Sequence, residues 1–479
     1  MSELLLYYQR PEPATWVFLS SFLLIGIFFV FHRFFCIRNL DILLLILLAP
    51  GLMMVYEGRK MRLSEQSSVA TSDSLAVGGH PVGHRWPPQT THYVSLNLQS
   101  NSLPSSPPSS YATDSNEWQA STVQFYGFLS LLIACGLLMI RMLVDQALVR
   151  RPLLEPNLNI GGLSFIGISL FLFLMANIVT SSPREQQESS PRLGPGYALL
   201  NMLPSLPTIP DHASSAEWPG RPTNGAQWLP NVARILAIVS NLAIVIGIIG
   251  VGYWHFDNIK TGIGCATMYL MLPYTAQMNG NLEHTTPAAL LTLALMTYRQ
   301  PMFSGLFLGA AAGLVYYPLF LLPLWFSFYW HKGIRPFLMG VSISLLVLVC
   351  LLLIHGMSAF TDHLRWMFGL WLPMMEGLSG IWGEDGLQAV FRLPVLVGFI
   401  LLSLSFCFWP IRKNLGTLMC GTAAIMLAAQ FWHGYGGGLF MAWFLPFVLL
   451  TIFRPNVDDR VANKVVGAKW FSRHVSSPV

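Results

Sequence analysis

Long apolar runs recur along nearly the whole chain, and shorter polar stretches separate them. A run of about 20 apolar residues is long enough to cross the hydrocarbon core of a bilayer as a helix. The pattern predicts segments at residues 14–31, 39–56, 123–143, 160–180, 231–253, 262–276, 286–298, 302–315, 317–330, 336–354, 389–409, 414–431 and 438–453. The predicted fold class is therefore all-α, a polytopic transmembrane helical bundle of about 11 to 13 membrane segments.

The stretch 302–330 is apolar throughout, but the sequence VYYP lies in its middle. Pro318 disfavours a continuous helix and also restricts the residue before it. Lys and Arg in short loops mark the cytoplasmic side of a membrane. Arg299 and Lys332 share one side only if the chain turns back between them. We therefore predict two short helices that are broken at VYYP.

The same charge rule predicts the orientation of the chain. Short basic loops follow every second segment, and they carry Arg33, Arg38, Arg141, Arg150, Arg151, Lys260, Arg299, Lys332, Arg335, Arg412 and Lys413. This places the N-terminus outside and the C-terminus in the cytoplasm. The expected location is the inner (plasma) membrane of a bacterium. The start, MSELLLYYQRPEPATW, has no basic region before its apolar run, so we expect no cleaved signal peptide.

Two long polar connections divide the chain. Residues 57–120 and 181–229 are rich in Ser and Pro and poor in apolar side chains, so we expect flexible loops outside the membrane. The predicted organisation is a four-span region over 1–180, the outer loop 181–229, a nine-segment core over 230–455 and a basic cytoplasmic tail over 456–479.

Composition agrees with a membrane protein. The 479 residues are 53% hydrophobic and 10% charged, whereas about 25% of the residues of a soluble domain are charged. The net charge of +5 gives no reason to expect nucleic acid as a partner. The 6 cysteines lie in or beside apolar segments without metal-binding spacing. Neither a disulfide, a metal site nor a cofactor is therefore predicted.

One polar stretch, YTAQMNGNLEHTTP at residues 274–287, interrupts the apolar pattern on the predicted outer face. We call it the polar island. Asn279, Gly280 and Asn281 could simply form a turn, because Asn-Gly pairs favour that geometry. Glu283 and His284 are harder to explain in this way, because ionisable groups near hydrocarbon are costly and usually serve a site. Hydration at the membrane boundary is the alternative explanation for them.

Three further outer turns carry comparable side chains. Tyr317 lies in VYYP, Arg365 in HGMSAFTDHLRWMFGLWLP and His433 in QFWHGYGGG. Together with the polar island they predict a polar cavity that faces outward. The structural alternatives are an interfacial helix that begins at TDHLRW, and an interfacial anchor formed by His433 beside Trp432.

The run GNLEHTTPAALLTLALMTYRQPMFSGLFLGAAAGLVYYPLFLLPLWFSFYWHKGIRPF resembles the central block of the GT-C-type membrane glycosyltransferases that use polyprenol-phosphate sugars. The matching features are Gly280 and Asn281 in an outer turn, Arg299 in a short turn, SGLFLGAAAG at 304–313 and PLFLLP at 318–323. The chain differs from that family at the break after the Gly/Ala helix, where VYY replaces the usual Lys.

The resemblance implies a polyprenyl-phosphate-linked sugar as the donor and a carboxylate as the general base at the outer face. In that family the catalytic carboxylate usually follows the first span, where this chain has Glu57. The candidates are Glu283 or Glu57 as the base; His284, His433 and Arg365 near the phosphate; and Asn279, Asn281 and Tyr317 near the sugar. A divergent or inactive relative is an alternative within the same family.

Two alternatives from other classes stay open. A multi-pass transporter of a polar solute would also use broken helices beside a cavity, and a non-catalytic membrane scaffold would use its long Ser/Pro loops for contacts. The stretches RNLDILLLILLAPG and LVRRPLLEPNLN also resemble a bacterial family of multi-pass membrane proteins without an assigned activity. The sequence carries no information on the oligomeric state.

Overall fold

The computed structural model describes residues 11–77, 110–145, 154–183, 196–208, 228–331, 333–354, 378, 380–383, 386–410, 413–434 and 440–455. Arg365 and the predicted tail 456–479 lie outside these ranges. All structural statements below concern the described residues.

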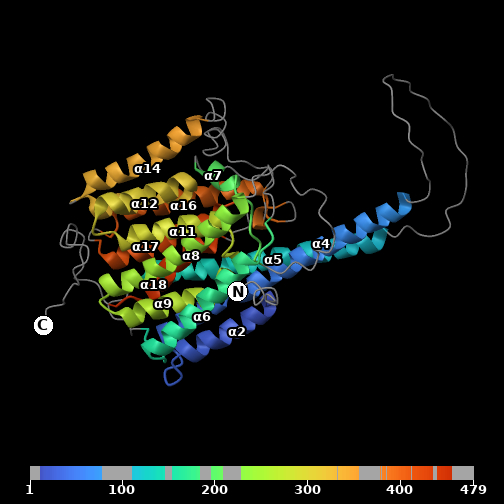
Figure 1. The fold of residues 1–479 in the computed structure, drawn as a ribbon, viewed down its shortest axis with the longest axis horizontal. Coiled ribbons are helices and arrows are strands. Elements are labelled where there is room, and N and C mark those ends of the chain that lie inside the picture. The colour runs from blue at the N-terminus through green and yellow to red at the C-terminus, as the bar shows by residue number, and fades with distance from the viewer. Residues whose placement is uncertain are drawn as a thin grey trace, which may run out of the picture.

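Every regular element of the described chain is a helix (Figure 1). The elements are α2 (Pro13–Phe28), α3 (Ile37–Ile46), α4 (Leu48–Val77), α5 (Ser110–Val144), α6 (Ile160–Val179), α7 (Tyr197–Asn201), α8 (Leu229–Trp254), α9 (Ile259–Met271), α10 (Pro273–Met278), α11 (Leu282–Met296), α12 (Pro301–Leu314), η2 (Tyr317–Leu321), α13 (Leu322–Tyr329), α14 (Ile334–Ile354), η3 (Gly380–Trp382), η4 (Ala389–Phe391), α16 (Arg392–Phe408), α17 (Leu415–Trp432), η6 (Met441–Trp443) and α18 (Leu445–Phe453). The prediction of an all-α polytopic bundle is confirmed.

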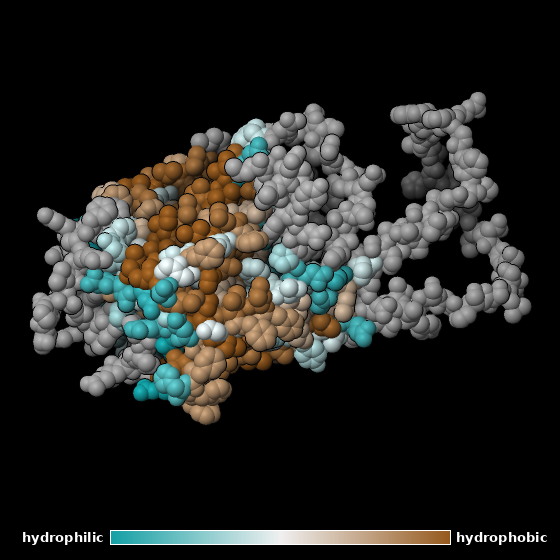
Figure 2. All heavy atoms as spheres, turned by 60° about the horizontal axis from the view of Figure 1, so that its bottom comes forward, coloured by the Kyte–Doolittle hydropathy of each residue, from teal (hydrophilic) through white to brown (hydrophobic). Residues whose placement is uncertain are grey.

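The surface of the bundle identifies it as a membrane protein. In the described chain, 7 helical stretches are long and apolar enough to span a bilayer, and shorter apolar helices lie beside them. Large apolar side chains point outward, among them Phe22 at 72% exposed, Phe165 at 74% and Phe408 at 79%. Figure 2 shows a broad hydrophobic band across the bundle, with hydrophilic residues towards both ends. The chain is therefore an integral membrane protein. The kind of membrane and the orientation remain predictions.

The stretch 302–330 breaks where the sequence predicts. Helix α12 ends at Leu314, Val315 is extended, and the 3₁₀ turn η2 begins at Tyr317. The chain then turns back, because the phenol of Tyr329 donates a hydrogen bond to the backbone oxygen of Tyr298, just before α12, at 2.6 Å. The end of α13 therefore lies at the same end of the bundle as the start of α12.

The predicted loop 57–120 is helical at both of its ends. Helix α4 continues to Val77 and α5 begins at Ser110, and Figure 1 shows the two side by side as they extend away from the bundle. Residues 59–77 and 110–120 contain neither Pro nor Gly, and every proline of the predicted loop falls between them. The low apolar content of these two stretches led to the prediction of a loop. They form helices instead, because they contain no helix-breaking residues.

Four charged side chains form a network inside the bundle, at the end opposite the polar island. Arg141 contacts both carboxylate oxygens of Asp41, at 2.6 and 2.9 Å, and donates to Asp145 at 2.8 Å. Arg454 donates to the second oxygen of Asp145 at 2.6 Å. All four side chains are buried, and their formal charges cancel. We call this set the buried charge network, and it joins α3 and α5 to the end of α18.

Three residues that the charge rule treated as simple cytoplasmic anchors are in fact buried. Arg141 belongs to the buried charge network, Arg299 donates to the backbone oxygen of Trp254, and Lys413 donates to Ser327 and to the backbone oxygen of Pro410. Helix packing surrounds these cations with carbonyl and carboxylate oxygens, which a count of charges along the sequence does not detect.

Helices α12 and α14 run parallel to each other, and their backbones pack in close contact. Gly305 lies against the backbone of Phe337 and Gly309 against that of Val341, while the hydroxyl of Ser344 donates to the backbone oxygen of Leu306 at 2.7 Å. A Cβ atom added to Gly340 would lie 2.1 Å from the backbone oxygen of Met302. Small residues permit such close packing in membranes.

We expect Gly340→Ala to destabilise the protein by about 1–3 kcal/mol, because backbone atoms must move to accept the methyl group. The matched control is Gly398→Ala in α16, where nothing lies within 4 Å of the added atom. Thermal unfolding of the detergent-purified variants measures the difference. Equal unfolding temperatures for the two variants would contradict the packing described for α12 and α14.

Candidate functional site

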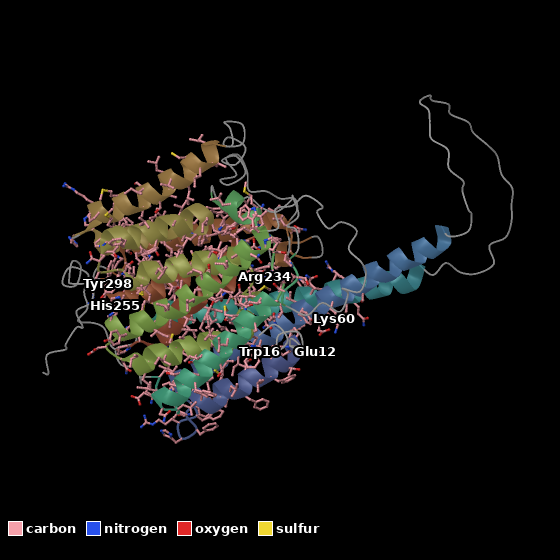
Figure 3. All side chains as sticks on the ribbon, in the orientation of Figure 1. Glu12, Trp16, Lys60, Arg234, His255 and Tyr298 are labelled. Atoms are coloured by element: carbon pink, nitrogen blue, oxygen red, sulfur yellow. The ribbon has the colours of Figure 1, made fainter. Side chains whose placement is uncertain are left out.

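The polar island joins two helix ends at one end of the bundle. In Figure 3 this is the end at which Arg234 is labelled, near the start of α8, and His255 and Tyr298 mark the opposite end. The chain bends at Leu272 between α9 and α10, and it becomes extended again at Asn281 before α11 begins. Gly280 is required here, because a Cβ atom would lie 2.1 Å from the backbone oxygen of Leu206.

The side chain of Glu283 lies in the first turn of α11 and is 31% exposed. One carboxylate oxygen accepts a hydrogen bond from the phenol of Tyr197 at 2.6 Å, and the other lies 3.5 Å from Nε2 of His284. The indole of Trp443 donates to the backbone oxygen of Glu283 at 3.1 Å. Both the carboxylate and the start of its helix are therefore held in place.

These contacts determine the protonation states of Glu283 and Tyr197. Burial by itself raises the pKa of Glu283, but the contacts with His284 and Tyr197 lower it, and the net pKa lies below its ordinary value. Burial, together with the neighbouring carboxylate, raises the pKa of Tyr197 well above its ordinary value. At neutral pH, Glu283 is therefore a carboxylate and Tyr197 a phenol that donates to it.

His284 is buried between two partners. Its Nδ1 lies 2.6 Å from the phenol oxygen of Tyr274, and its ring stacks on Phe440 with centroids 4.4 Å apart. With Nε2 facing the Glu283 carboxylate, the arrangement favours a proton on Nε2 and a hydrogen bond from Tyr274 to Nδ1. Glu283, His284 and Tyr274 thus form a continuous polar line into the bundle.

A column of closely spaced rings connects the polar island to VYYP and to the end of α17. It runs from His284 through Phe440, His433 and Tyr317 to Tyr316, with neighbouring centroids 4.4, 4.5, 4.8 and 4.3 Å apart. Four segments that lie far apart in the sequence contribute to this ring column: the start of α11, the residue before η6, the end of α17 and the start of η2.

The structure therefore brings together four of the predicted site residues, which are Glu283, His284, Tyr317 and His433. The ring column explains the presence of Tyr317 and His433, because aromatic pairs with this spacing stabilise one another. Three of the four are buried, and only Glu283 presents a substantial part of its side chain at the surface. Glu283 is accordingly the group of this set that a substrate can reach.

Three other predicted residues are not part of this group. The side chain of Asn279 points to α6 and donates to the backbone oxygen of Leu174 at 2.9 Å. The amide of Asn281 lies 3.3 Å from the sulfur of Met278. Glu57 lies on α4, and no described hydrogen bond or ion pair links it to the polar island. Arg365 lies outside the described residues.

Sequence reasoning missed three residues that the fold places at the site. Tyr197 lies in the predicted loop 181–229, where nothing in the composition distinguishes it. Tyr274 is the first residue of the polar island, and its position there was the available signal. Arg392, at the start of α16, is buried, and its guanidinium donates to the backbone oxygen of Trp432 at 3.1 Å, next to His433. It is the cation that borders the ring column.

No three His, Cys, Asp or Glu side chains of the described chain are grouped so that they could hold a metal ion. Comparisons with protein-family models, with curated proteins and with solved structures found no match to this chain. The geometry of the site is therefore the basis for its interpretation.

The contact between Tyr197 and Glu283 can be tested with a double-mutant cycle. We expect Tyr197→Phe and Glu283→Gln each to destabilise the protein, and the double variant to lose little more than either single one. The coupling should be about 1–3 kcal/mol, as for a hydrogen bond to a charged group. Thermal unfolding of all four proteins measures it. Strictly additive losses would show that the two side chains do not interact.

Proposed function

We propose that this chain is a membrane glycosyltransferase that transfers a sugar from a polyprenyl-phosphate donor, with Glu283 as the general base. The observation that carries the proposal is the carboxylate of Glu283. It is partly exposed at one end of a membrane bundle and is held by Tyr197 and His284. The resemblance of the central block to GT-C-type enzymes supplies the donor class.

The roles of the other residues follow from their contacts. Tyr197 and the backbone contact from Trp443 orient the carboxylate. His284 lies against the same carboxylate and is itself held by Tyr274. Arg392 supplies the positive charge that borders the ring column, on the side of Trp432 and His433. Cations near a leaving phosphate stabilise the charge that develops on it.

The reaction exchanges one bond at the anomeric carbon and transfers one proton. An acceptor hydroxyl attacks the anomeric carbon of the sugar, and Glu283 takes the hydroxyl proton. The bond between the anomeric carbon and the phosphate oxygen breaks, and polyprenyl phosphate leaves with the electron pair. A carboxylate that is ionised at neutral pH is ready for this role, because no proton must first be removed from it.

We expect Glu283→Gln to lower transfer by about 10²–10⁴-fold, the range over which general base catalysis contributes. Glu57→Gln is the matched control, because Glu57 has no described contact with the site, and it should keep full activity. The assay follows polyprenyl-phosphate mannose and polyprenyl-phosphate glucose, labelled in the sugar, in membranes from cells that express the full chain. If Glu57→Gln lost activity and Glu283→Gln kept it, Glu57 and not Glu283 would be the general base.

A transporter is the second candidate, and two helix breaks beside the site favour it. The chain interrupts its helices at Leu272 and at Val315, within the elements that flank Glu283 and the ring column. Transporters place polar groups at such breaks. If no donor is consumed in membranes that hold the folded protein, while uptake of a polar solute into vesicles depends on Glu283, the transporter is the better account.

A further inference from the structure

A small cavity lies at the same end of the bundle as Glu283, and two residues of the polar island, Ala276 and Gln277, line part of it. Its walls come from the first turns of α2, the last turn of α6, the segment after α7, and α10. The residues that define it are Pro13, Trp16, Asn177, Thr208 and Gln277. We call it the α2–α10 cavity. Figure 3 labels Trp16 and Glu12 at this end of α2.

Two hydrogen-bond donors at this cavity have no partner in the described part of the chain. They are the indole nitrogen of Trp16 and the side-chain amide nitrogen of Gln277, and both atoms are buried. Gln277 is 7% exposed, and its backbone oxygen accepts a hydrogen bond from Thr208 at 2.7 Å, which fixes this turn of α10. A buried donor without an acceptor costs about 1–3 kcal/mol. The two donors therefore point to a ligand that supplies an acceptor oxygen.

The chemistry of the cavity limits that acceptor. The volume is about 20 Å³, and one water-sized atom needs about 10–15 Å³. One or two acceptor atoms fit, but a sugar ring does not. The described residues that line the cavity are all neutral, and the exposed Glu12 lies between Pro11 and Pro13 at its edge. A phosphate would require a cation here, so the acceptor is a neutral oxygen such as a carbonyl.

The surroundings identify the source of the carbonyl. Helices α2 and α6 run antiparallel, because Asn157, ahead of α6, donates to the backbone oxygen of Gly26 at 3.1 Å, near the other end of α2. Beyond the cavity, α2 exposes Phe18 at 62% and Phe22 at 72%, and α6 exposes Leu172 at 63%. These side chains belong to the apolar surface of the bundle, where acyl chains lie.

We propose that the α2–α10 cavity binds the ester carbonyl of a membrane glycerophospholipid, with Trp16 and Gln277 as its two hydrogen-bond donors. The acyl chains lie along the apolar surfaces of α2 and α6, and the glycerol region lies at the level of the cavity mouth. The depth agrees with the position of Trp16 near the start of an apolar helix, since Trp is enriched at the membrane interface. This site does not depend on the proposed transferase activity.

The test compares two lipids that differ only in the carbonyl groups. The probes are a diester phosphatidylcholine and the diether phosphatidylcholine with the same chains, each added to the full-length protein in detergent. We expect the diester to raise the unfolding temperature until the effect saturates, and to stay bound to the protein in native mass spectrometry. The diether, which lacks the acceptor, should do neither. Equal effects of the two lipids would overturn the proposal.

Variants test the two donors. Gln277→Leu and Trp16→Phe should each raise the half-saturating concentration of the diester about fivefold, which corresponds to a hydrogen bond worth about 1 kcal/mol. Trp228→Phe is the matched control, because this Trp lies at the start of α8 and is 61% exposed. It should leave the concentration unchanged. Unchanged diester binding in both donor variants would mean that the cavity holds only water.

A second measurement separates ligand binding from folding. Without lipid, Gln277→Leu should unfold at the same temperature as the wild type or a higher one, because it removes a buried donor that has no partner. With saturating diester, the unfolding temperature of the wild type should rise more than that of the variant. A variant that is less stable than the wild type without lipid would show that Gln277 has a structural role, and would count against the proposal.

Discussion

The buried charge network is the constraint that connects the first helices of this protein to its last one. Arg141 and Arg454 share Asp145, and Arg141 also binds Asp41 through both carboxylate oxygens. Removal of one member would leave a charge without its partner inside the bundle, which is far more costly than an exposed ion pair. Gly416 is part of the arrangement, because a Cβ atom there would lie 2.5 Å from the guanidinium of Arg454. The network therefore sets how α3, α5, α17 and α18 meet.

The candidate site forms at the opposite end of the bundle. The end of α17 supplies His433, the residues before α18 supply Phe440 and Trp443, and the start of α11 supplies Glu283. Each belongs to a helix end, where the chain leaves regular structure and side chains can converge. The ring column fills the space between these ends, and Tyr197, from within the predicted loop 181–229, donates a hydrogen bond to the carboxylate. The bundle thus positions one partly exposed acid on a largely apolar support.

The α2–α10 cavity and the candidate site share α10 but face different surroundings. Gln277 faces a neutral cavity near the lipid-facing helices α2 and α6, whereas Tyr274, on the same short helix, contacts His284. A lipid bound at the cavity would pack against the helix that supports His284. The tests of the two proposals use separate residues. Gly280 lies between Gln277 and Glu283 in the sequence, and its lack of a Cβ atom lets the backbone of Leu206 approach closely.

The sequence by itself determined the fold class, the position of most apolar helices, the break at VYYP and the polar stretch between two helices that carries Glu283 and His284. These features are local, because hydrophobic length, proline position and the cost of a charge near hydrocarbon act along the chain. Only the tertiary structure decided which side chains meet. Tyr197, from a Ser/Pro-rich stretch, contacts Glu283, whereas Asn279 contacts α6. Glu57 lies apart on α4, and Arg141 is buried between two carboxylates. Such contacts depend on how helices distant in sequence pack, and no pattern within one segment records that packing.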